Sequence, residues 1–132
     1  MIKKNHVLTM LLLAASVLFS ACVLEYDFDR RGPWTNSLGR PVTATNASGT
    51  ARGFGGDVTV TLNLVNGFIE NVRIDARRET ASYAVRVVPL TERNAVLLNS
   101  FDFLPVTGAT RTSDAVRQAG ESALVSAGAL LD

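Results

Sequence analysis

Residues 57–74, DVTVTLNLVNGFIENVRI, decide the fold that the sequence predicts. Apolar and polar residues alternate strictly over residues 58–64, which is typical of a strand with one buried face. The pair Asn66-Gly67 follows and favours a two-residue hairpin turn. Residues 68–74 then return as a second strand. Simple alternation places Ile69 on the opposite face from its apolar neighbours, so the sequence leaves the register of this strand open.

Segments on either side extend this hairpin into an α+β domain. A β pattern that begins at Val42 adds one or two strands, so we expect an antiparallel sheet of three or four strands with one apolar face to be covered. Residues 83–88 can form a helix that Pro89 interrupts, and residues 90–98 are a further helical or mixed piece. The expected fold is therefore a small antiparallel sheet packed against two or three helices.

A loop of small and hydroxylated residues, TGATRTS at positions 107–113, precedes the last helical pattern. Its glycine permits close backbone approach, and a helix start offers unpaired N–H groups and a partial positive charge. The loop therefore suits a bound phosphate. We expect Thr112 or Ser113 to be the helix N-cap, with Asp114 in the first turn and Gly128 as the stop.

The N-terminal segment has the pattern of a secretory signal peptide. Two lysines, an apolar run at residues 7–19 and small residues before Cys22 form a basic region, an apolar core and a cleavage site. The small residues before this cysteine resemble the lipobox of bacterial lipoproteins, with Phe19 where leucine is commonest, and imply that Cys22 is lipidated. Ordinary secretion with cleavage nearby and an uncleaved anchor are the alternatives. The expected division is a signal peptide at 1–21, a lipidated N-terminus and tether at 22–38, and one domain at 39–132.

The composition of the mature segment excludes several kinds of chemistry. The one histidine, His6, lies in the signal peptide, and Cys22 is the one cysteine, which excludes an internal disulfide, nucleophiles activated by histidine and zinc sites built on these residues. Arginine and acidic residues nearly balance, which argues against nucleic acid as a partner. We expect no metal site and no catalytic residue, although a carboxylate pair that meets only in space stays open.

Two stretches resemble the FMN-binding domain family. Residues 107–116, TGATRTSDAV, resemble its flavinylation motif, Ser/Thr-Gly-Ala-Thr-x-Thr-Ser, which a helix follows. Residues 49–74 resemble the N-terminal half of the same domain, with a glycine-rich turn, an alternating strand, an Asn-Gly hairpin and a return strand. Such domains occur in flavoprotein subunits of sodium-translocating NADH:quinone oxidoreductase and related electron-transfer complexes, and as small lipoproteins. The two stretches stand in the family's order and span most of the mature domain.

The resemblance implies FMN as the cofactor and implies which residues hold it. Thr110 aligns with the threonine that receives FMN through a phosphoester bond. Further contacts are implied for Thr107, Gly108, Ala109, Thr112, Ser113, Gly55, Gly56, Glu79 and Thr80. More ordinary roles stay open: the hydroxyls after Thr110 can simply cap the helix, the two glycines can form a hairpin corner, and the Glu-Thr pair can be surface residues at a helix start.

The sequence departs from the family pattern at two places. Leu104 stands where the motif usually has an aspartate, which puts the efficiency of the flavin transferase that reads this motif in doubt. Ala81 and Ser82 stand where Pro-Gly usually follows the Glu-Thr pair, so contacts at the flavin ring can differ.

The expected function is that of an electron carrier outside the cytoplasmic membrane rather than an enzyme with its own substrate. The expected partners are a flavin transferase, a membrane electron-transfer complex or extracytoplasmic redox partner, and the membrane itself through the lipid anchor. A lipoprotein that binds FMN noncovalently and a structural lipoprotein that has lost the cofactor are the alternatives.

Overall fold

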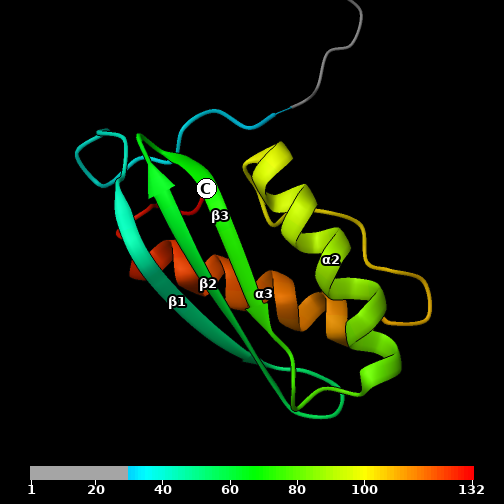
Figure 1. The fold of residues 1–132 in the computed structure, drawn as a ribbon. Coiled ribbons are helices and arrows are strands. Elements are labelled where there is room, and N and C mark those ends of the chain that lie inside the picture. Colours follow the sequence, from blue (N-terminus) through cyan, green and yellow to red (C-terminus); the bar gives the residue numbers. More distant parts are fainter. Residues whose placement is uncertain (1–29) are drawn as a thin grey trace, which may run out of the picture.

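The computed structural model describes residues 30–132, so the expected signal peptide, Cys22 and the first part of the tether lie outside the described residues. Three strands, β1 (Ala44–Arg52), β2 (Asp57–Val65) and β3 (Phe68–Asp75), form an antiparallel sheet in the order β1-β2-β3. Two helices follow, α2 (Ala81–Leu98) and α3 (Thr110–Ser126). Helix α3 crosses one face of the sheet over β1 and β2, and α2 packs beside β3 (Figure 1). The predicted α+β fold is confirmed.

The alternating residues of β2 form the centre of the core. Val58, Val60, Leu62 and Leu64 are each at most 1% exposed, as the pattern predicts. Burial of such side chains stabilises the fold by about 1.5–3 kcal/mol each. Helix α3 packs very closely on the sheet, since a Cβ added at Gly49 of β1 would lie 2.3 Å from a backbone oxygen of the helix. Strands β1 and β2 are thereby held under α3.

The hairpin forms at Asn66-Gly67, as predicted. Both residues have positive φ, 51° and 82°, which is the backbone of a type I′ turn. A bulge in β3 then settles the register: Leu64 pairs with Ile69, whereas the residue before Leu64 pairs with Asn71, so Glu70 is the extra residue. The bulge puts Ile69 on the buried face, where simple alternation does not place it.

Helix α2 continues through Pro89, so the prediction that this proline interrupts the helix was wrong. Pro89 has no N–H to donate to the carbonyl of Val85, but both residues are exposed and water can satisfy that carbonyl. The buried face of the helix is formed by Val87, Thr91 and Ala95, at a spacing of four residues. A proline on the solvent side is therefore tolerated.

Helix α3 begins three residues earlier than the N-cap prediction requires. Ala109 occupies the N-cap position, and Thr112 and Ser113 lie buried in the first turn, so the prediction that one of them caps the helix was wrong. Asp114 falls one turn further on than expected. Gly128 has a φ of +93° just past the helix end, and the predicted stop is confirmed.

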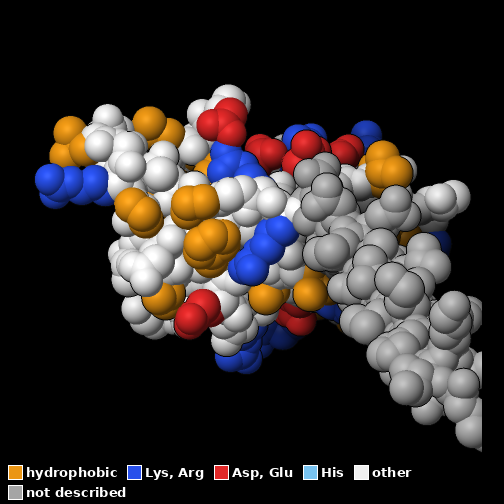
Figure 2. Space-filling model, turned by 90° about the horizontal axis from the view of Figure 1, so that it is seen from above, with side chains coloured by type: hydrophobic (Ala, Val, Ile, Leu, Met, Phe, Trp, Pro, Cys, Tyr) orange, Lys and Arg blue, Asp and Glu red, His pale blue; other side chains and the backbone are white. Residues whose placement is uncertain are grey.

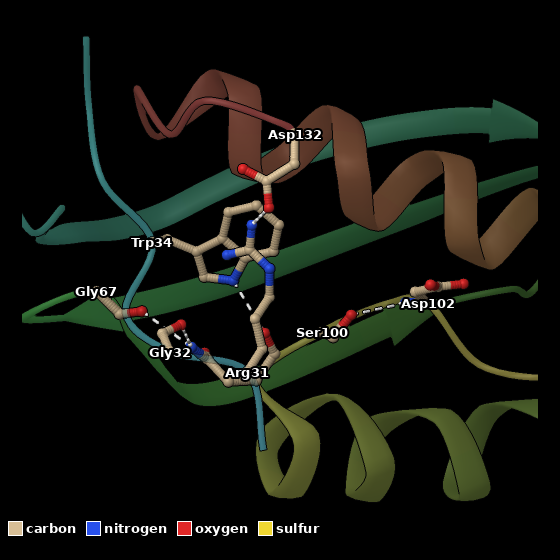
Figure 3. Close-up of polar contacts among 8 residues, drawn as sticks. Arg31, Gly32, Trp34, Gly67, Ser100, Asp102 and Asp132 are labelled. Atoms are coloured by element: carbon tan, nitrogen blue, oxygen red, sulfur yellow. Dashed lines mark hydrogen bonds and ion pairs between the residues drawn. The ribbon is translucent and has the colours of Figure 1, made fainter. Parts of the chain in front are cut away.

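Asn99 closes the end of the domain that carries the hairpin turn. It is fully buried in the left-handed conformation after α2. Its side-chain oxygen accepts the N–H of Ile69 at 2.8 Å, and its amide donates to the carbonyls of Gly32 at 2.9 Å and Gly67 at 3.1 Å. Its own carbonyl accepts the indole N–H of Trp34 at 3.0 Å (Figure 3). Trp34 lies in the expected tether, where its apolar character left packing on the domain open; it is 5% exposed and belongs to the core.

The surface carries charges of both signs. At the end that carries the hairpin turn, Figure 2 shows basic and acidic side chains interspersed with apolar ones. Arg31 illustrates the mixture, because its guanidinium lies 3.4 Å from the centre of the Trp34 ring and pairs with Asp132 (Figure 3). Of the helices within residues 30–132, neither has the length and apolar character needed to cross a membrane.

Candidate functional site

The predicted loop and the glycine-rich turn meet at the end of the domain opposite Asn99. The turn of residues 53–56 joins β1 to β2 and lies next to the start of α2 (Figure 1). An open cavity of about 270 Å³ is lined by Phe54, Tyr83 and residues 108–112. The structure therefore brings the start of α3, the start of α2 and the glycine turn to one place.

Thr110 is the first residue of α3 and is exposed at this cavity. The N–H groups of the first helical turn have no intrahelical acceptor, so they face outward with a partial positive charge. Gly108 has a φ of +80°, which other residues adopt only with strain. An accessible hydroxyl thus lies at a helix start, where an attached phosphate would be stabilised.

Arg86 of α2 adds a positive charge beside the loop. Its guanidinium donates to the carbonyl of Thr107 at 2.5 Å, and a Cβ added at Gly108 would lie 3.5 Å from it. Arg111 follows Thr110 and lines the same cavity. The carbonyl of Thr107 accepts the hydrogen bond from Arg86, whereas the Thr107 side chain is exposed. The sequence reasoning missed both arginines, which come from different helices.

The two hydroxyl residues of the first turn have different surroundings. Ser113 is fully engaged, since its hydroxyl accepts the N–H of Val106 at 3.0 Å and donates to the carbonyl of Ala109 at 2.9 Å. Thr112 is buried, and its hydroxyl has no hydrogen-bond partner within residues 30–132. An unsatisfied buried hydroxyl costs about 1–3 kcal/mol. Ser113 ties the loop to the helix, and Thr112 has hydrogen-bonding capacity left over.

Two aromatic side chains frame the cavity on the side away from the loop. The rings of Phe54 and Tyr83 meet edge to face, with their centres 5.4 Å apart and an angle of 80° between their planes. Phe54 is 53% exposed, which is unusual for a large apolar side chain with a fixed neighbour. The sequence reasoning missed both rings. The sequence did contain a signal for Phe54, since it is a large aromatic residue within a run of glycines at positions 53–56.

Glu79 and the glycine turn lie behind this aromatic pair. Glu79 is 6% exposed, and its carboxylate accepts the N–H groups of Phe54 at 2.8 Å, Gly55 at 2.5 Å and Thr80 at 3.0 Å. Burial raises the pKa of this carboxyl, but the three N–H groups outweigh burial and hold the pKa below its ordinary value of 4.5. The Thr112 hydroxyl also lies near and lowers the pKa slightly, without reaching hydrogen-bond geometry.

The predicted glycines and Thr80 face protein groups in this arrangement. A Cβ at Gly55 would lie 3.0 Å from the Thr80 hydroxyl, and one at Gly56 would lie 2.5 Å from the carbonyl oxygen of Arg78. Thr80 occupies the N-cap position of α2 without a side-chain cap bond in the described chain. These residues build the wall that carries Phe54, and a direct contact between them and a flavin stays a prediction.

Other features of the described residues are less suited to a cofactor. A cavity of about 610 Å³ lies beside Arg31 and Asp132 and shares no lining residue with the Thr110 cavity. Within residues 30–132, no three acidic, histidine or cysteine side chains gather where they could hold a metal ion. Four of the predicted residues, Gly108, Ala109, Thr110 and Thr112, line the Thr110 cavity, and we take it as the candidate site.

Comparison of the sequence with models of protein families identifies the family to which this domain belongs. Residues 53–125 match the FMN-binding domain model, from the glycine turn to the last turn of α3. A comparison with curated proteins finds no match. The family match covers more than half of the chain and includes the glycine turn, Glu79, Thr110 and Thr112. The chain therefore belongs to the FMN-binding domain family, and FMN is its cofactor.

Proposed function

We propose that the protein is an electron carrier outside the cytoplasmic membrane, with FMN esterified through its phosphate to the hydroxyl of Thr110. The observation that carries the proposal is the cavity at the start of α3. It combines an accessible hydroxyl, a helix N-terminus and a pair of aromatic rings within one small space. These are the groups needed for a phosphate at one side and a flat aromatic ring at the other.

The unsatisfied hydroxyl of Thr112 supports the fit between these residues and FMN. It is buried in the wall of the Thr110 cavity and has a proton to donate. A phosphate oxygen is a strong acceptor, so a phosphate at the start of α3 would remove the cost of this unpaired group. Arg86 and Arg111 lie at the same loop and would offset the charge of a phosphodiester.

Bound FMN supplies the redox chemistry, and the protein holds and orients it. In this proposal the Thr110 oxygen would lose its hydroxyl proton and form a P–O bond to the FMN phosphoryl group, while the group that carried FMN in the transferase's donor would leave. The first turn of α3 and Arg86 stabilise the remaining negative charge. Phe54 and Tyr83, which line the same cavity, would provide the aromatic surface for the flavin ring. Covalent attachment is advantageous where no free flavin pool can refill an empty site.

The location and the partners rest on the N-terminal sequence. The signal-peptide pattern and the lipobox-like residues before Cys22 support secretion and anchoring through a lipid. We propose that a flavin transferase loads the domain and that a membrane electron-transfer complex and an extracytoplasmic acceptor exchange electrons through it.

The covalent link is tested by producing the protein together with its flavin transferase and recording flavin fluorescence on a denaturing gel. Wild type and Thr110→Ser should give a fluorescent band, because both present a hydroxyl at the start of α3. Thr110→Ala should give none. Ser126→Ala is the control and should give a fluorescent band, since this exposed hydroxyl lies at the far end of α3 and outside the motif. A wild-type band without fluorescence contradicts the covalent link.

Leu104 keeps noncovalent binding as the second candidate. It stands where the family motif usually has an aspartate, and its side chain is 91% exposed. If FMN is held noncovalently, denaturation followed by dialysis will release all flavin from the wild type. For the covalent proposal we expect Leu104→Asp to increase the rate of labelling by the transferase, with a change in the free energy of unfolding within about 0.5 kcal/mol because the side chain is on the surface.

A further inference from the structure

Glu79 is buried and ionised, yet the proposed electron transfer does not use it. Its carboxylate holds two parts of the chain together: one oxygen accepts from Phe54, and the other accepts from Gly55 and from Thr80 at the start of α2. The glycine turn is thereby fastened to the helix that carries Tyr83.

The turn is shaped around this carboxylate. A Cβ added at Gly53 would lie 1.9 Å from Oε2 of Glu79, and one at Gly55 would lie 3.1 Å from Oε1. A Cβ and another heavy atom do not approach within 3.0 Å unless one of them moves. Gly53 therefore has no room for a side chain while the Glu79 carboxylate is in place. The close approach of Glu79 therefore requires a glycine at position 53, whereas Gly56 faces Arg78.

The side chain that this arrangement fixes is an exposed one. The backbone N–H of Phe54 donates to Glu79, and the ring of Phe54 projects out of the turn to meet Tyr83. Because Phe54 is 53% exposed, it contributes little to the core. A buried charge with three hydrogen bonds would be a costly way to hold a ring that served stability alone. An exposed ring held rigidly at a cavity is typical of a binding surface.

We infer that Glu79 is a positioning residue, which fixes Phe54 against Tyr83 so that the two rings form a rigid wall for the flavin of the Thr110 cavity. The inference rests on the proposed placement of FMN in that cavity. Without the carboxylate, the turn of residues 53–56 loses its anchor and Phe54 swings away from Tyr83. FMN then stays attached at Thr110, but its ring is no longer covered.

Glu92, which lies within α2, provides a matched control. Its carboxylate also accepts a backbone N–H, that of Ile74 at 2.9 Å, but it does not line the Thr110 cavity. Glu79→Ala, just before α2, and Glu92→Ala, within α2, therefore both remove a carboxylate that accepts backbone N–H groups. Both variants should lower stability, and only Glu79→Ala should change the surroundings of the flavin.

The experiment uses the full chain loaded by the transferase, with quenching of flavin fluorescence by iodide as the readout. We expect the quenching constant of Glu79→Ala to rise several-fold toward that of free FMN, with the amount of attached flavin unchanged. Glu92→Ala should keep the wild-type value. Glu79→Gln should fall between wild type and Glu79→Ala, because its amide oxygen still accepts an N–H. Wild-type quenching in folded, labelled Glu79→Ala overturns the inference.

A second measurement on the unloaded protein separates this inference from the proposed function. NMR should show cross-relaxation between the rings of Phe54 and Tyr83 in wild type and in Glu92→Ala, and should show its loss in Glu79→Ala. If wild type takes no covalent flavin but these contacts behave as expected, the proposed function fails and the role of Glu79 in holding the rings stands. If the ring contact persists in folded Glu79→Ala, the inference fails whatever happens at Thr110.

Discussion

The two ends of this domain use buried polar groups in opposite ways. At the hairpin end, Asn99 uses its side-chain oxygen, its side-chain amide and its carbonyl in hydrogen bonds to the chain. At the opposite end, Thr112 is equally buried and its hydroxyl has no partner in the described residues. Phe54 shows the same contrast with Trp34, since one ring is half exposed and the other is part of the core.

The difference separates groups that stabilise the fold from groups that wait for a ligand. A fully satisfied network such as that of Asn99 orders the backbone and is complete without a cofactor. An unsatisfied hydroxyl and a fixed exposed ring make the unloaded protein less stable, and a bound group can offset this loss. Changes at the hairpin end should therefore alter stability, and changes at the Thr110 end should alter flavin binding more than stability.

The largest effect on stability is expected for Asn99→Ala. It leaves the buried N–H of Ile69 without an acceptor, which costs about 1–3 kcal/mol, and removes one donor each from the carbonyls of Gly32 and Gly67. We expect the free energy of unfolding in urea to fall by about 3–5 kcal/mol, since a left-handed alanine adds strain. Asn94→Ala, whose side chain makes no hydrogen bond in the described part, is the control and should change it by less than about 0.5 kcal/mol. A similar loss in both variants would break the comparison.

The next effect is expected for Gly53→Ala at the other end. The new Cβ must displace either the turn or the Glu79 carboxylate, and such overpacking costs about 1–3 kcal/mol. Gly32→Ala serves as the control, because a Cβ there meets nothing within 4 Å. Gly53→Ala should also expose the flavin ring to quenching, and Asn99→Ala should not do so in its folded fraction. Unchanged stability in Gly53→Ala would show that the turn is looser than described.

Acidification provides a test that needs no change of packing. Because the folded state holds the pKa of Glu79 below its ordinary value of 4.5, the ionised carboxylate stabilises the fold at neutral pH. This contribution is complete above the unfolded pKa and is lost as pH falls through the lower, folded pKa. The difference in free energy of unfolding between wild type and Glu79→Gln should therefore be constant near pH 7 and shrink below about pH 4.5. A difference independent of pH would contradict an ionised Glu79.

The smallest effect on stability, and the one that distinguishes the two ends most sharply, is expected for Thr112→Val. Removal of an unsatisfied hydroxyl should leave the unloaded protein unchanged or more stable by up to about 1 kcal/mol. Its affinity for free FMN, measured by fluorescence titration of the unloaded chain, should fall by about fivefold to tenfold because one phosphate hydrogen bond is lost. Ser113→Ala should instead lower stability, since the N–H of Val106 loses its acceptor. Destabilisation of the same size in Thr112→Val would mean that its hydroxyl already has a partner.

Local patterns were sufficient to predict most of the fold. The alternation of residues 58–64 predicts the buried face of β2, and Asn66-Gly67 predicts a turn that requires two positive φ angles. The bulge at Glu70 was not predictable from alternation, because it depends on pairing with the neighbouring strand. The continuation of α2 through Pro89 depends on that residue facing solvent, which only the packed structure shows.

The site was predictable where its residues are close in sequence. The loop at Thr110 stood out because glycine and hydroxyls precede a helical pattern, although the start of the helix was placed too late. Arg86, Tyr83 and Phe54 were missed because they reach the cavity from other elements. The role of the glycine turn also required the structure, since Gly53 approaches a carboxylate that lies 26 positions further along the chain.

The most direct test of the account is the mass of the protein after production with the flavin transferase. The intact chain should gain the mass of one FMN less one water, because a phosphoester bond forms with loss of water. Cleavage after arginine should place this gain on the peptide of residues 94–111, and fragmentation should assign it to Thr110 rather than Thr107. An unmodified chain, or a modification on another residue, would contradict the claim that Thr110 carries FMN.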